Sequence, residues 1–147
     1  MKLAIVDDNK LEQELIFNTL RTYEHERNIS LDISSYSDGN PFLNTYVPGD
    51  FDLIFMDAAK GQYIHFMPDI LRLLKTGGTL VSDNVLQDGD IIESHYAVIR
   101  RNRTIYKRMR EYLYELTHRK DLVTAVLPVG DGITVSTKVE VENDEKE

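Results

Sequence analysis

The stretch Phe51-Asp-Leu-Ile-Phe-Met-Asp57 decides the fold of this chain. It is a short run of large, mostly apolar residues that ends in a carboxylate, which is typical of a buried strand in a parallel sheet. Such a strand carries Asp57 to its C-terminal end, where ligands collect in open α/β sheets. We therefore expect residues 51–57 to form the central strand of the fold.

The composition predicts one acidic domain. The chain has 147 residues, the usual length of a single domain, and we expect residues 1–147 to form one domain with an acidic tail at 142–147. Its net charge of −8 argues against nucleic acid and anionic membranes as partners. The chain contains no cysteine and no apolar run near the ~20 residues of a membrane span. We expect a cytoplasmic protein, either monomeric or weakly homodimeric.

Upstream of the central strand, the pattern predicts strand, helix, strand and short helix. Residues 3–6 form a continuous apolar run, and a helix follows from about Lys10 to Glu26, with Asn9 or Asp8 as its N-cap. The apolar positions of this helix should form one stripe against the sheet: Leu11, Leu15, Ile16, Leu20 and Tyr23. Residues 31–34 alternate as an outer strand does, and a short helix runs from Pro41 to about Tyr46.

Downstream, the pattern predicts two helices and three strands. A helix over 62–75 should bury Phe66, Ile70, Leu73 and Leu74, and a long helix ending near His118 should bury Ile105, Met109, Leu113 and Leu116. Strands are expected at 79–82, 122–129 and 133–139 or 141, the last two forming an antiparallel pair. The fold class is then α/β, a single doubly wound and mostly parallel sheet with the last strand antiparallel.

The first half carries one family resemblance. Val6-Asp7-Asp8 after the first strand and Asp57 after the third resemble a response-regulator receiver domain of the LytTR type, over about residues 1–57. The resemblance implies a flavodoxin-like first half in which Asp7, Asp8 and Asp57 hold Mg²⁺ and Asp57 accepts a phosphoryl group. The pattern stops after Asp57, and residues 127–130 stand where a receiver has its essential lysine.

The second half carries another. Four stretches, at 51–63, 73–78, 81–86 and 127–132, are together similar to bacterial metal-dependent O-methyltransferases related to the catechol and caffeoyl-CoA enzymes. This resemblance covers about residues 51–140 and implies a Rossmann-like half. Together the two resemblances imply the strand order 2-1-3-4-6-5, in which the receiver supplies 2-1-3 and the methyltransferase adds 4-6-5. It makes Asp57, Asp83 and Asn84 the ligands of Mg²⁺, and Lys60 the catalytic lysine that deprotonates or orients a substrate hydroxyl.

The methyl-donor site of that family is not recognisable in the sequence. The resemblance implies a glycine-rich turn after the first strand, where S-adenosylmethionine approaches the backbone closely. Here residues 7–10 are Asp-Asp-Asn-Lys, and the first glycine of the chain is Gly39. We therefore expect S-adenosylmethionine binding to be lost or very weak.

Three functions follow from these patterns. The main hypothesis is a recombined or engineered chimera of the two families, without evolved catalytic activity, that retains an acidic divalent-cation site. The first alternative is a metal-dependent O-methyltransferase. The second is a phosphoacceptor receiver domain of a two-component system.

The candidate site lies at the carboxyl ends of the strands. Five polar residues should converge there and bind Mg²⁺ or Ca²⁺ through oxygen atoms: Asp7, Asp8, Asp57, Asp83 and Asn84. In the alternative, Lys60 fills the site as an internal counter-ion and keeps it free of metal. A separate basic run could contact phosphate, but fits the solvated face of the long helix better: Arg100, Arg101, Arg103, Lys107, Arg108 and Arg110.

Overall fold

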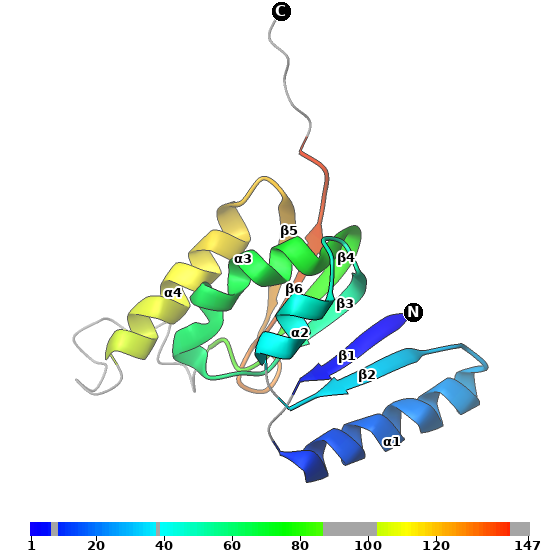
Figure 1. Cartoon of the computed structure of the whole chain (residues 1–147). Coiled ribbons are helices and arrows are strands. Elements are labelled where there is room, and N and C mark those ends of the chain that lie inside the picture. Colours follow the sequence, from blue (N-terminus) through cyan, green and yellow to red (C-terminus); the bar gives the residue numbers. More distant parts are fainter. Residues whose placement is uncertain (7–8, 38, 87–102, 142–147) are drawn as a thin grey trace, which may run out of the picture.

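The computed structural model describes residues 1–6, 9–37, 39–86 and 103–141, and shows an α/β arrangement (Figure 1). Its elements, in chain order, are β1 (Lys2–Val6), α1 (Lys10–Arg27), β2 (Asp32–Tyr36), α2 (Gly39–Thr45), β3 (Phe51–Met56), the 3₁₀ turn η1 (Lys60–Gln62), α3 (Tyr63–Leu73), β4 (Leu74–Ser82), α4 (Arg103–His118), β5 (Leu122–Leu127) and β6 (Ile133–Lys138). Among the described helices, none combines the length and apolarity that crossing a membrane requires.

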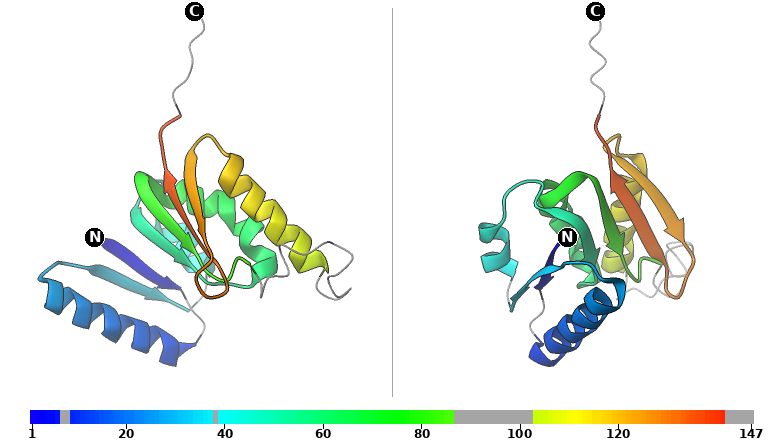
Figure 2. Two further views of the ribbon diagram at one scale, coloured as in Figure 1. Left: turned by 180° about the vertical axis from the view of Figure 1, so that it is seen from behind. Right: turned by 90° about the vertical axis from the view of Figure 1, so that its right-hand side faces the viewer.

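The strands form two sheets rather than one. The main sheet has the order β3-β4-β6-β5, with β3 and β4 parallel and β6 antiparallel to both of its neighbours. β1 and β2 form a separate parallel pair beside β3 (Figures 1 and 2). The predicted order is thus correct over the last four strands, but the prediction of one continuous sheet is wrong at the step from β1 to β3.

Side chains, not a backbone ladder, join the two sheets. Rings of Tyr36, Phe42, Tyr46 and Phe51 contact one another at the junction, with centroids 4.8–5.9 Å apart. Lys2 Nζ lies 4.5 Å from the centre of the Tyr46 ring and 3.1 Å from an Asp50 carboxylate oxygen. This ring cluster, with Ala4 and Lys2 of β1, holds the β1–β2 pair beside β3 through side-chain packing, and no backbone ladder pairs β1 with β3.

The main core lies between one face of the main sheet and helices α3 and α4 (Figure 2). The predicted stripes are confirmed in part: Leu73, Leu74, Met109 and Leu116 are buried, and Ile70 and Leu113 pack against the core partly buried. Phe66 and Ile105, both predicted to be buried, are 43% and 38% exposed. The helices also bury residues outside those stripes, among them Tyr63 and Tyr112, and the Tyr112 hydroxyl lies 2.6 Å from the Ser82 hydroxyl.

Helix α1 is the largest departure from the predicted packing. Asn9 caps it as predicted, with its side-chain oxygen accepting a hydrogen bond from the Leu11 amide at 3.1 Å. However, none of its residues is buried, and Leu11 and Leu15 are 77% and 68% exposed. The side toward β1 and β2 carries the half-buried Phe17 and Leu20. A pair of strands is too narrow to cover a whole helix face, so of the predicted stripe only Leu20 turns inward.

Helix α3 ends earlier than predicted, and β4 begins at once at Leu74. Lys138, on β6, donates hydrogen bonds to the carbonyls of Leu71 and Leu74 at 2.7 and 2.8 Å. Because this ammonium satisfies carbonyls at the helix end, the chain leaves the helix before reaching the glycines at 77 and 78. Pro68 lies inside α3 without dividing it.

Candidate functional site

Three of the predicted site residues follow adjacent parallel strands. Asp57 comes directly after β3, and Asp83 and Asn84 come directly after β4. The Asp83 amide donates to the Met56 carbonyl at 3.1 Å, which holds the two strand ends together. Asn84 adopts a left-handed backbone conformation (φ 52°), and its amide donates to an Asp83 carboxylate oxygen at 2.7 Å. The structure therefore brings these three residues to the carboxyl ends of two neighbouring strands of the main sheet.

The Tyr63 hydroxyl links the carboxyl ends of β3 and β4. This buried hydroxyl lies 3.0 Å from the Asp83 carbonyl and 3.4 Å from the Met56 carbonyl, and accepts a hydrogen bond from the Ala58 amide at 3.3 Å. Burial raises the pKa of Tyr63, and the negative charges of Asp57 and Asp83 raise it further. Both carboxylates thus act electrostatically on the same hydroxyl. The sequence analysis gave Tyr63 no role, although it closes the 51–63 motif.

Lys60 reaches toward the turn between β5 and β6. Its ammonium lies 3.5 Å from an Asp131 carboxylate oxygen. Hydrogen bonds of 2.9 Å from the amides of Val85 and Leu86 to the carbonyls of Gly132 and Asp131 tie this turn to the segment after β4. Asp131 had no role predicted from the sequence, although the residue lies in the 127–132 motif.

Gly132 is required where that turn meets the site. Its φ is +85°, and a Cβ there would collide with the Leu86 side chain. Only glycine combines this conformation with so close an approach. The backbone at 132 therefore fixes the position of Asp131 and, through the ion pair, of Lys60.

The chemistry of the donor set fits a hard divalent cation. Asp57 and Asp83 offer carboxylate oxygens and Asn84 an amide oxygen, which suit Mg²⁺ or Ca²⁺ completed by water. Across residues 1–6, 9–37, 39–86 and 103–141, no group of three His, Cys, Asp or Glu side chains is arranged to hold a metal. Asp7 and Asp8, which the sequence analysis assigned to the same site, lie outside the described residues. The prediction of a metal site stays a prediction.

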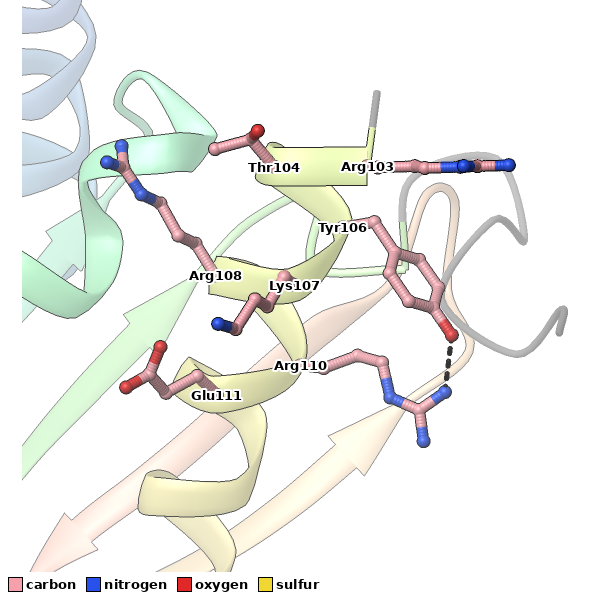
Figure 3. A pocket seen from close by; sticks show the side chains of 7 residues that line it. All are labelled: Arg103, Thr104, Tyr106, Lys107, Arg108, Arg110 and Glu111. Atoms are coloured by element: carbon pink, nitrogen blue, oxygen red, sulfur yellow. Dashed lines mark hydrogen bonds between the residues drawn. The ribbon is translucent and has the colours of Figure 1, made fainter. Parts of the chain in front are cut away.

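A hollow with basic walls lies along the first turns of α4 (Figure 3). It is lined by Arg103, Thr104, Tyr106, Lys107, Arg108, Arg110 and Glu111. Arg108 donates to the Gly61 carbonyl at 3.0 Å, which ties α4 to the residue after Lys60. Arg110 donates to the Tyr106 hydroxyl at 2.6 Å. Part of the predicted basic run therefore holds the fold together, and Arg100 and Arg101 lie outside the described residues.

Comparison with known proteins decides between the two resemblances. A family profile described as O-methyltransferase matches residues 2–139, which includes nearly all of the first half as well as the second. The chain belongs to the O-methyltransferase family. A caffeoyl-CoA O-methyltransferase from Eucalyptus gunnii is 32% identical over 97 residues, which are 63% of this chain and 38% of that protein.

Solved structures show the same fold in longer chains. A Corynebacterium glutamicum protein superposes with a TM-score of 0.73 at 20% identity, over 99% of this chain and 63% of that one. The O-methyltransferase TomG from Streptomyces achromogenes, solved in complex with S-adenosylmethionine, gives a TM-score of 0.64 at 18% identity, over 95% of this chain and 62% of that one. The chain thus spans less than two thirds of each of these proteins.

These findings change the main interpretation. The O-methyltransferase profile extends through the first half, and the comparisons give no support to a receiver domain, a flavodoxin-like half or a chimera. They back the alternative of an O-methyltransferase better than the main hypothesis. TomG, a protein of similar fold, binds S-adenosylmethionine, and the expectation that this chain binds it very weakly or not at all stays a prediction.

Proposed function

We propose that this O-methyltransferase-family chain transfers a methyl group from S-adenosylmethionine to a hydroxyl group, with a divalent cation at the strand ends. The observation that carries the proposal is the position of Asp57, Asp83 and Asn84 directly after the neighbouring strands β3 and β4. Lys60 pairs with Asp131, on a turn that is hydrogen-bonded to the segment after Asn84. This end of an open α/β sheet is where such folds bind their ligands.

The metal ligands in this proposal are Asp57, Asp83 and Asn84. A bound Mg²⁺ or Ca²⁺ would lower the pKa of an acceptor hydroxyl placed next to it. Tyr63 supports these ligands, because its hydroxyl contacts the backbone of both strand ends. A preorganised pair of strand ends keeps the ligands in place before the acceptor arrives.

Lys60 is the proposed catalytic residue. During transfer a bond forms between the hydroxyl oxygen and the methyl carbon while the carbon–sulfur bond of the sulfonium breaks, so the hydroxyl must lose its proton. A neutral Lys60 amine accepts that proton, and a protonated Lys60 stabilises the resulting oxyanion. Asp131 is the positioning residue for the protonated form, since its carboxylate lies 3.5 Å from the Lys60 ammonium.

The acceptor class follows from the relatives and from the basic hollow. The named relatives act on caffeoyl-CoA, a hydroxylated aromatic joined to an anionic carrier. In this chain Arg108 links α4 to Gly61, next to Lys60, and the hollow along α4 adds Arg103 and Lys107. Basic side chains at this place suit an acceptor that carries negative charge. We propose a hydroxylated aromatic acceptor with an anionic group.

The test combines binding with product detection. The protein is incubated with S-adenosylmethionine, Mg²⁺ and caffeoyl-CoA, and mass spectrometry follows S-adenosylhomocysteine and the methylated product. We expect product from the wild type, and at least about a hundred-fold less from Lys60→Ala or Asp83→Ala. Asp69→Asn is the matched control, since Asp69 lies on α3 with a side chain 48% exposed and should leave the rate unchanged.

Calorimetry separates loss of activity from loss of the cofactor site. No heat of binding with S-adenosylmethionine and no product would contradict the proposal. If Mg²⁺ still raised the Tm in that case, the chain would retain a cation site without catalysis, which is what the chimera hypothesis predicts.

A further inference from the structure

Helix α4 contacts the segment that carries Lys60. Arg108, on α4, donates a hydrogen bond to the Gly61 carbonyl at 3.0 Å, and its side chain extends from the helix toward the neighbouring ribbon (Figure 3). Ile105 packs at the same place, since a Cβ on Gly61 would lie 3.5–4.0 Å from side-chain atoms of Arg108 and Ile105. The first turns of α4 therefore hold η1, and with it the backbone from which Lys60 extends.

One turn further along, the same helix contacts the end of β4. The hydroxyls of Tyr112 and Ser82 lie 2.6 Å apart, and both residues are fully buried. Asp83 is the next residue after Ser82. The Tyr112 ring also meets the Tyr63 ring edge to face, with centroids 5.4 Å apart, and the Tyr63 hydroxyl lies 3.0 Å from the Asp83 carbonyl. The strand end that leads to the proposed metal ligands is thus held by two tyrosines, one of them on α4.

A third hydroxyl in this layer makes no hydrogen bond within the described residues. Thr134, on β6, is opposite Ser82 in the register of the main sheet and is fully buried. Its Oγ1 has no partner in the described part of the chain. Thr134 therefore shares the burial and the neighbourhood of Ser82 without a link to α4, which makes it the control for that link.

Given the proposed function, on which this inference rests, we propose that Arg108 and Tyr112 are positioning residues for separate parts of the site. Arg108 fixes the segment of Lys60, which must meet the acceptor hydroxyl. Tyr112 fixes the end of β4, and with it Asp83 and Asn84. Because both act from one helix, α4 sets the position of the catalytic lysine relative to the metal ligands. Hydrogen-bonded supports of this kind orient metal ligands and catalytic groups.

The two residues predict different losses. Tyr112→Phe removes the hydroxyl that holds the end of β4 and should raise the dissociation constant for Mg²⁺ about ten-fold, with kcat at saturating Mg²⁺ changed by less than about two-fold. Arg108→Met removes the hydrogen bond to Gly61 and should lower kcat about ten-fold, with the dissociation constant for Mg²⁺ unchanged. Calorimetry measures Mg²⁺ binding, and turnover of caffeoyl-CoA with S-adenosylmethionine measures kcat. Parallel losses of both quantities in both variants would contradict the proposal.

Each variant has a matched control that should change neither quantity. Thr134→Val removes a buried hydroxyl that has no partner among the described residues, at nearly constant volume. Lys120→Met removes an exposed positive charge from the turn after α4. Weaker Mg²⁺ binding in Thr134→Val, equal to that in Tyr112→Phe, would mean that any change in this layer disturbs the site.

A double variant separates positioning from stability. Tyr112→Phe leaves the Ser82 hydroxyl buried without its partner, whereas Tyr112→Phe combined with Ser82→Ala removes both hydroxyls and should recover part of the lost Tm. If the pair positions Asp83, Mg²⁺ binding stays about ten-fold weaker in the double variant. Recovery of Mg²⁺ binding together with the Tm would show a role in stability alone and would overturn the proposal. Ser82→Ala replaces Tyr112→Phe if that variant does not fold.

Hydrogen exchange of the metal-free protein gives a readout that needs neither Mg²⁺ nor activity. The amides of Asp83 and Gln62 each donate to a backbone carbonyl, at 3.1 and 2.7 Å. Tyr112→Phe should speed exchange about ten-fold at Asp83 and leave Gln62 unchanged, and Arg108→Met should do the reverse. This pattern in a protein that forms no product would uphold the positioning roles and reject the proposed function. Equal acceleration at both amides, or none, would overturn the positioning roles.

Discussion

From β3 onward the helices and most of the strands contribute buried side chains to one core, whereas α1, the longest helix of the first half, contributes none. The first half is joined to the rest by a small cluster around Tyr46, Phe51 and Leu73. Both regions have good helical and strand patterns. The difference teaches that a helix buries its apolar side only where the sheet beneath it is wide enough, so the two regions should differ in stability.

The largest expected effect comes from truncating the main core. Leu80 on β4 is fully buried, so Leu80→Ala should lower the free energy of unfolding by about 2–5 kcal/mol. Leu15→Ala removes the same atoms from a residue that is 68% exposed on α1. It should change the free energy of unfolding by less than about 0.5 kcal/mol. Urea denaturation of the two variants measures the difference, and equal losses would contradict the comparison.

The second effect is alkaline destabilisation of the main core. Burial raises the pKa of Tyr112 above its ordinary value of 10, so the folded protein keeps a proton that the unfolded chain releases. Stability is therefore fully present below about pH 10 and is lost as the pH rises, by up to about 1.4 kcal/mol per pH unit for this tyrosine. In an alkaline titration, Tyr112 should ionise only when the protein unfolds, so the last rise in tyrosinate absorbance should coincide with unfolding. Ionisation of every tyrosine at a pH below the unfolding transition would contradict this.

A third effect tests the support of the site. Tyr63→Phe removes the hydroxyl that contacts the backbone of both strand ends and should cost about 1–3 kcal/mol of stability. It should also weaken the binding of Mg²⁺, since Asp57 and Asp83 would be held less firmly. Tyr23→Phe on α1 is the control, with a ring 46% exposed. An unchanged Mg²⁺ titration in Tyr63→Phe would show that the hydroxyl does not support the site.

The smallest effect is confined to the first half. Asn9→Ala removes the N-cap of α1 and should destabilise that helix by about 0.5–1 kcal/mol. Because α1 buries no residue, we expect helical circular dichroism to fall while the cooperative unfolding of the main core keeps its midpoint. A shift of that midpoint by the full amount would mean that α1 and the main core unfold as one unit.

The sequence predicted local structure well and packing less well. The placement of Asp57, Asp83 and Asn84 at strand ends follows from short apolar runs and the turns between them, whereas the order of β3, β4, β6 and β5 follows from the resemblance to O-methyltransferases. These signals are local, because a polar residue directly after a buried parallel strand must lie at the carboxyl end of the sheet.

What the sequence did not predict depends on distant partners. Tyr63 and Tyr112 are buried although neither belongs to a predicted stripe, and their hydroxyls contact the Asp83 carbonyl and the Ser82 hydroxyl, far along the chain. Lys138 ends α3 from a strand 67 residues away. The width of the sheet beside α1 is likewise a property of the whole fold, so the stripe on that helix could not reveal that most of it stays exposed.

Native-state hydrogen exchange tests the central claim most directly, because it measures the opening of α1 and of the main core in the same molecule. We predict that amides of residues 10–27 exchange through local opening, with protection at least about a hundred-fold below that of β4 and the buried turns of α4. Equal protection in α1 and in β4, lost together in mild denaturant, would contradict the account.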